Sequence, residues 1–118
     1  AYSRIDVALD PFPFNGGITT TDSLWMGVPV LTVAGNTYVG RQGVAVLTRL
    51  GLTDFVADSP ADLVEKAKSW ANRRADLAEI RAGLRERMAA SVVCDAPRYV
   101  RNLESAFRDL WKQRLPNG

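Results

Sequence analysis

Residues 15–33 of the chain read NGGITTTDSLWMGVPVLTV, and this stretch predicts a tight turn, a short helix and a buried strand. Gly16 and Gly17 allow the backbone to adopt positive φ angles and to approach a ligand closely. The first N–H groups of the following helix have no partner inside that helix, and they carry the positive end of its dipole. The turn and the helix start therefore predict a site for an anion such as a phosphate.

The helix is predicted over residues 19–27. Thr19 and Asp22 have the spacing of a capping box, in which both side chains satisfy N–H groups at the helix start. Pro29 prevents the helix from continuing, and residues 30–33 form an apolar, β-branched run that is typical of a core strand. The same spacing is also typical of an ordinary turn followed by a capped helix, so the pattern alone leaves a purely structural role open.

A strand is predicted before this stretch, over residues 5–9, and it ends at Asp10. Parallel sheets bind ligands in the loops at the carboxyl ends of their strands. Asp10 is therefore a candidate for the site, although capping of the turn is its favoured role. Phe12 and Phe14 are expected to close the core rather than to pack beneath a bound base.

A third predicted strand completes the first half of the chain. The strand at 30–33 leads into a polar, glycine-containing loop and then into an amphipathic helix that Gly51 ends. Residues 54–57 are predicted to form a short strand. Residues 1–57 are thus expected to form a β-α-β-α-β half of a nucleotide-binding sheet.

The second half of the chain, residues 58–118, is predicted to be helical. Ser59 has the properties of an N-cap, and Pro60 fits the first position of a helix. Similar periodicity predicts two further helices. The predicted helices span residues 60–72, 74–90 and 95–114.

The last predicted helix carries an apolar stripe that is rich in aromatic side chains. Core packing is its expected role, but the stripe is broader than one small sheet needs to cover. We therefore expect part of it to be exposed, and we expect the chain to self-associate through residues 95–114 as a homodimer. The stripe consists of Tyr99, Leu103, Phe107, Leu110 and Trp111.

Composition excludes several functional classes. The length of 118 residues suits one domain, and contents of 47% hydrophobic and 24% charged residues are ordinary for a globular protein. Basic residues alternate with acidic ones at a net charge of +2, so nucleic-acid binding is not expected. No apolar run is long enough to span a bilayer, so we expect no membrane association. The lone Cys94, in a chain without histidine, predicts a buried thiol, no zinc site and a reducing, cytoplasmic location.

From Asp6 to Leu52 the chain resembles the carboxy-terminal catalytic lobe of O-GlcNAc transferase-like glycosyltransferases, and it does so more loosely to its end. The bacterial branch, often fused to tetratricopeptide repeats, is the most similar. The stretch that carries the resemblance is DVALDPFPFNGGITTTDSLWMGVPV, residues 6–30. The resemblance implies an α/β fold. Residues 1–118 would be a single fragment, a Rossmann-like half of a GT-B carboxy-terminal lobe with about three parallel strands, followed by a helical tail.

The resemblance also implies a binding site for a UDP-sugar. It places Gly16, Gly17 and two threonines, Thr19 and Thr20, at the diphosphate. It places Asp22 at the ribose hydroxyls. A role for this carboxylate in capping the helix is the alternative.

Arg41 matches an arginine that lies near the diphosphate in the family. Contact with the donor and exposure to water are equally open for this side chain. Two departures from the family pattern affect the site. Animal members carry a histidine just before their threonine pair, where this chain has Gly17 and Ile18. Many bacterial relatives have a threonine in place of Ile18, which leaves Thr19 and Thr20 as the matching hydroxyls.

The function implied by the resemblance is donor binding in a glycosyltransferase. Such an enzyme would transfer a sugar, GlcNAc or a hexose, from a UDP-sugar to a protein hydroxyl or amide. A helix start can stabilise the leaving diphosphate without a metal ion, so no metal and no cofactor are expected. The catalytic residue is not identified.

The alternative function is a non-catalytic Rossmann-like module that serves assembly or regulation. An active enzyme would need the amino-terminal catalytic lobe to bind its protein acceptor, and that lobe is missing from these residues. We therefore expect the fragment alone to be inactive.

Overall fold

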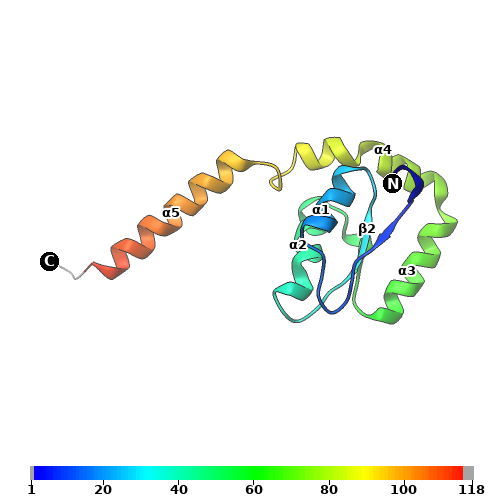
Figure 1. Ribbon diagram of the computed structural model, residues 1–118, viewed down its shortest axis with the longest axis horizontal. Coiled ribbons are helices and arrows are strands. Elements are labelled where there is room, and N and C mark those ends of the chain that lie inside the picture. The colour runs from blue at the N-terminus through cyan, green and yellow to red at the C-terminus, as the bar shows by residue number, and fades with distance from the viewer. Residues whose placement is uncertain (1, 116–118) are drawn as a thin grey trace.

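The computed structural model describes residues 2–115; residues 1 and 116–118 lie outside the described part. Three strands form one parallel sheet with β2 in its centre (Figure 1). The three predicted parallel strands are therefore confirmed, although the two outer strands are shorter than predicted. The strands are β1 Ala8–Leu9, β2 Val30–Val33 and β3 Val56–Ala57.

Helices cover both faces of this sheet. Figure 1 shows α1 and α2 on one side and α3 on the other. Helix α4 returns across the molecule to contact α1, and α5 leads away from the sheet. The helices are α1 Ile18–Trp25, α2 Gln42–Arg49, α3 Pro60–Asn72, α4 Arg74–Ala89 and α5 Ala96–Arg114, with short 3₁₀ helices at Tyr2–Arg4, Val39–Arg41 and Thr53–Phe55.

The core is centred on β2, whose four residues are all buried. This pattern is typical of a central parallel strand with helices on both faces. Ala8 of β1 pairs with Val30, and Val56 of β3 pairs with Thr32, so β2 pairs with both outer strands. Buried side chains from the helices and from the connection before β3 fill the two faces. The largest fully buried apolar residues are Phe55, Leu24, Leu31, Leu47 and Leu84.

Local sequence signals explain most helix ends. The Ser59 hydroxyl accepts a hydrogen bond from the Asp62 N–H at 3.1 Å, which confirms the predicted cap of α3. Gly51 has a φ of 68° and follows the last turn of α2, as predicted. Gly27 has a φ of 77° and occupies the same position after α1. Because glycine at this position ends a helix, α1 stops at Trp25 and not at residue 27.

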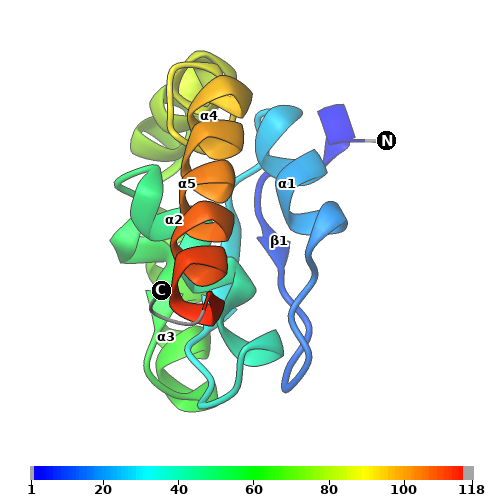
Figure 2. The same ribbon diagram turned by 90° about the vertical axis from the view of Figure 1, so that its left-hand side faces the viewer.

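Helix α5 projects from the rest of the molecule (Figure 1), and Figure 2 views the molecule from the side toward which it projects. None of the side chains of α5 is buried. Tyr99, Phe107 and Trp111 are 62–66% exposed. The prediction that the apolar stripe packs in the core is therefore wrong, whereas the expectation that part of the stripe is exposed is confirmed. The projection makes the molecule elongated, with extents of 65 × 29 × 22 Å.

Other burial predictions also fail. Cys94 is exposed, because it lies in the connection between α4 and the projecting α5. Phe12 and Phe14 are exposed as well, since their loop lies beyond the end of β1. None of the helices within residues 2–115 is both long and apolar enough to cross a membrane.

Candidate functional site

The start of α1 lies just after the loop that follows β1. Helix α1 begins at Ile18, with Gly17 as its N-cap and no side chain capping it. The prediction that Thr19 and Asp22 form a capping box is therefore wrong, because both residues lie inside the helix. The cap role offered as the alternative for Asp22 fails for the same reason.

Four consecutive backbone N–H groups are free at this helix start. Within residues 2–115, no hydrogen bond is donated by the backbone N–H groups of Gly17, Ile18, Thr19 or Thr20. Unpaired N–H groups at a helix start, together with the helix dipole, favour an anion. The geometry of the predicted anion site is thus present, with the donors coming from the backbone.

The positive φ angles predicted for the two glycines of the turn are wrong. Gly27 and Gly51 are the glycines with positive φ among residues 2–115, and Gly17 has a φ of −99°. A Cβ atom on Gly16 would lie 2.3 Å from the Thr19 hydroxyl oxygen. Gly16 therefore leaves room for the neighbouring side chains that approach its Cα closely.

Asp10 holds the turn in place through hydrogen bonds to its buried carboxylate. Its buried carboxylate accepts hydrogen bonds from the Gly16 N–H at 2.7 Å and from the Thr32 hydroxyl at 2.8 Å. The turn role favoured for Asp10 is confirmed, and the bond to Thr32 ties the turn to the central strand as well. Because the Gly16 N–H donates to Asp10, it is not free to bind a phosphate. A Cβ atom on Gly43 would lie 2.6 Å from the same carboxylate, so glycine at this position lets α2 pack closely.

The two predicted threonines lie in different environments. Thr20 is buried, and its hydroxyl lies 2.8 Å from the Gly16 carbonyl oxygen, to which it donates. Thr19 is exposed in the first turn of α1. Asp22 is exposed one turn further along the same helix. Each of the three residues is within or beside the helix start, but only the Thr20 hydroxyl is engaged inside the protein.

A groove of about 780 Å³ lies between the start of α1 and α2. It brings Gly16, Gly17 and Arg41 together, as predicted for a common site, whereas Thr19, Thr20 and Asp22 do not line it. The Arg41 side chain is exposed and donates to the Gly35 carbonyl at 3.1 Å. We call this hollow the α1–α2 groove; it is lined by Gly16, Gly17, Ile18, Thr21, Tyr38, Arg41, Gln42, Val44, Ala45, Val46 and Thr48.

The groove also contains polar residues that no sequence pattern indicated as site residues. Thr21, Tyr38 and Gln42 line it beside the predicted residues. The segments that precede α1 and α2 are held together by the Asn15 N–H, which donates to the Val39 carbonyl at 3.0 Å. Gln42 directly follows the predicted site residue Arg41, at the start of the second helix. This position in the sequence could have indicated that Gln42 lines the groove.

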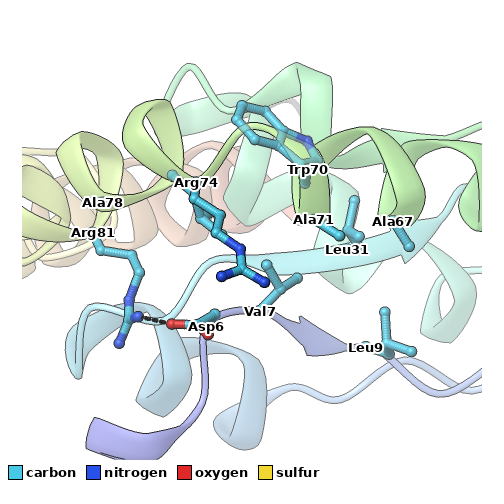
Figure 3. A pocket seen from close by; sticks show the side chains of 11 residues that line it. Asp6, Val7, Leu9, Leu31, Ala67, Trp70, Ala71, Arg74, Ala78 and Arg81 are labelled. Carbon is cyan, nitrogen blue, oxygen red and sulfur yellow. Dashed lines mark hydrogen bonds and ion pairs between the residues drawn. The ribbon is translucent and has the colours of Figure 1, made fainter.

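A second hollow of about 500 Å³ lies beside β1 and beneath α3 and α4 (Figure 3). Its walls are mainly apolar, and Arg74 and Arg81 reach into it from α4. Arg81 forms an ion pair with Asp6. This hollow contains none of the predicted site residues. Among residues 2–115 there is also no cluster of side chains suited to hold a metal ion.

Comparison with known proteins identifies the family. Residues 3–103 match the model of Glycosyl transferase family 41. The chain belongs to this family. The resemblance found in the sequence is thereby confirmed, and the free N–H groups at the start of α1 lie in a chain of a glycosyltransferase family.

Similar members of family 41 include the "Probable UDP-N-acetylglucosamine--peptide N-acetylglucosaminyltransferase SPINDLY" of Arabidopsis thaliana, 42% identical over 96% of this chain. The SPINDLY protein of Oryza sativa subsp. japonica is 44% identical over the same share. This chain spans only 12% of the length of either relative.

The family is also represented among solved structures. A Thermobaculum terrenum O-GlcNAc transferase mutant, K341M, is 33% identical and superposes with a TM-score of 0.87. The match covers 95% of this chain and 22% of that one. The predicted fold class, a fragment of a GT-B lobe with a three-stranded parallel sheet, is therefore confirmed.

Proposed function

We propose that this chain is the donor-binding portion of a glycosyltransferase that uses a UDP-sugar. One observation carries the proposal. In a chain of family 41, the free N–H groups that begin at Gly17 and the side chain of Arg41 lie beside one groove. Relatives named for transfer from UDP-N-acetylglucosamine to peptides support a UDP-linked GlcNAc or hexose as donor and a protein hydroxyl or amide as acceptor.

The proposed mechanism stabilises the leaving group. When the bond between sugar and diphosphate breaks, negative charge accumulates on the diphosphate oxygens. Aimed N–H groups and the α1 dipole would stabilise this charge in place, and Arg41 would add a full positive charge. Such a site works without a metal ion or a cofactor.

Within this proposal each predicted residue has a distinct role. Gly17, Thr19 and Thr20 would bind the diphosphate through the backbone, and the Thr20 hydroxyl would hold the turn together with Gly16. The exposed carboxylate of Asp22 would accept hydrogen bonds from the ribose hydroxyls.

The remaining parts of the enzyme would come from further sequence. We propose that an amino-terminal lobe supplies the acceptor site and the catalytic group, and that tetratricopeptide repeats accompany it in a cytoplasmic protein. The 12% share of the SPINDLY relatives is consistent with such an arrangement. The catalytic group itself stays unassigned.

The proposal is tested by titrating the ¹⁵N-labelled chain with UDP and, in parallel, with GDP. We expect UDP to shift the amide resonances of residues 17–20 and to leave those of α5 unchanged. GDP tests whether the base contributes to binding. Resonances of 17–20 that stay in place at millimolar UDP would contradict donor binding and favour a non-catalytic module.

A further inference from the structure

Gln42 lies across the α1–α2 groove from the start of α1. It is the first residue of α2, and it is only partly exposed. Its carboxamide oxygen lies so close to Gly17 that a Cβ atom on that glycine would be 2.7 Å away. The carboxamide of Gln42 is therefore positioned over the N-cap of α1, where the run of free N–H groups begins.

This carboxamide has unused hydrogen-bonding capacity. Within residues 2–115, the Gln42 side chain makes no hydrogen bond, although Arg41 beside it bonds to the Gly35 carbonyl. A carboxamide offers two N–H donors and one acceptor. Because the Gln42 carboxamide lines the groove without a hydrogen-bond partner in the protein, it is available to a ligand or to water.

The charge of the groove favours a polyanionic ligand. Arg41 is the only charged residue among those that line it. One phosphate can be bound by the N–H groups at the start of α1. Gln42 and Arg41 approach from α2 and the loop before it, so they suit a second phosphate attached to the first.

We propose that Gln42 is a residue that binds the sugar donor. The oxygen of its carboxamide faces Gly17, and its nitrogen donates a hydrogen bond to the diphosphate on the side that faces α2. This inference rests on the proposed function and adds to it a residue that selects a nucleoside diphosphate over a monophosphate. Gly17 has a supporting role here, because a side chain at this position would displace the carboxamide.

The test measures the affinities of UDP and UMP for the chain and for Gln42→Met, which keeps the length of the side chain and removes its donors. A hydrogen bond to a charged group is worth about 1.5 kcal/mol, so UDP should bind about tenfold more weakly to the variant. The affinity for UMP should change less than twofold. Gln113→Met, the same substitution on the exposed α5, should bind UDP as the wild type does.

Gln42→Glu provides a second variant of equal size. Its negative charge should repel the diphosphate and weaken UDP binding more than Gln42→Met does. The inference is overturned if Gln42→Met binds UDP within twofold of the wild type, or if UDP and UMP lose affinity equally. Failure of the wild type to bind UDP overturns the proposed function as well, so the two failures are distinguishable.

Discussion

At the scale of single residues, Asp10 determines the geometry of the candidate site. Its buried carboxylate is bonded to the Gly16 N–H and the Thr32 hydroxyl, and Gly43 packs against it. The carboxylate thus joins the turn, the central strand and α2. Because it orients the Gly16 N–H inwards, the free N–H groups begin one residue later, at Gly17.

Asp10→Ala should destabilise the fold strongly. The substitution leaves the Gly16 N–H and the Thr32 hydroxyl without acceptors, and each unsatisfied buried donor costs about 1–3 kcal/mol. We expect the free energy of unfolding to fall by about 2–4 kcal/mol in a urea melt. Asp54→Ala, at an exposed site, should change it by less than about 0.5 kcal/mol. Equal midpoints for the two variants would contradict this role of Asp10.

Asp22→Ala should separate binding from folding. Asp22 is exposed and makes no capping bond, so the free energy of unfolding should change by less than about 0.5 kcal/mol. Losing a carboxylate that accepts ribose hydroxyls should weaken UDP binding by about 1.5–3 kcal/mol. Calorimetric titration and a denaturant melt on the same protein give both values. A variant that melts early but binds UDP normally would show that the residue is structural.

Residue roles were the least predictable part of the site from sequence. The glycine pair and the helix start follow from local sequence, because turn and helix preferences depend on neighbours in the chain. The capping box failed because α1 begins one residue early, which places Thr19 inside the helix. The contact between Gln42 and Gly17 joins the first residue of α2 to the N-cap of α1, and no local sequence pattern indicates such a contact.

At the scale of elements, α4 holds the end of α1 opposite the site. Arg81 donates to the Gly27 carbonyl at 3.2 Å and pairs with Asp6. The Arg85 guanidinium lies over the Trp25 ring, 4.9 Å from its centroid. Together these contacts fix the carboxyl end of α1, and this in turn orients the free N–H groups at its other end.

A pair of glycine substitutions compares the end of α1 with the middle of α4. Gly27→Ala should destabilise the chain by about 1–2 kcal/mol, because φ is 77° at this position and the added Cβ would lie 3.2 Å from the Arg81 carbonyl oxygen. Gly83→Ala, in the middle of α4 with open space around it, should stabilise the chain by about 0.5–1 kcal/mol. Thermal melts give both signs. A stabilising Gly27→Ala would contradict the strain at the end of α1.

Elements were more predictable from sequence than residue contacts. The start of α3 follows from Ser59 and Pro60, and the end of α2 from Gly51, since these signals act within one turn. The outer strands were predicted too long because the sheet pairs only two residues of each with β2. Burial of the α5 stripe was mispredicted because amphipathic periodicity reports an apolar face but not what covers it.

At the scale of the whole molecule, the projecting α5 carries more exposed large apolar side chains than any other described element. Val100, Leu103, Phe107 and Leu110 follow the alternating spacing of three and four residues that is typical of helix pairs. In an antiparallel pair about a two-fold axis, Val100 would face Leu110 and Leu103 would face Phe107. Such a pair is closed and self-complementary.

The exposed area suits such a pair. Fully buried aromatic side chains each cover about 150–250 Å², so the exposed parts of Tyr99, Phe107 and Trp111 offer roughly 400 Å² on each helix. The exposed parts of Val100, Leu103 and Leu110 bring this to roughly 600 Å², the lower end of the ~600–1,000 Å² per partner of a standard interface. A second copy of α5 is therefore a sufficient partner.

We predict that the chain is a dimer at micromolar concentration and that Phe107→Glu makes it monomeric, because the substitution places a charge in the centre of the pair. Trp111→Ala, at the edge, should weaken the dimer less than Phe107→Glu does, because binding energy is concentrated near the centre of an interface. Tyr38→Ala removes a still more exposed aromatic side chain away from α5 and should leave the dimer intact. Sedimentation equilibrium distinguishes these outcomes. A wild-type chain that stays monomeric at 100 micromolar, roughly the upper range of weak specific association, would mean that the stripe is reserved for a different surface, such as the proposed amino-terminal lobe.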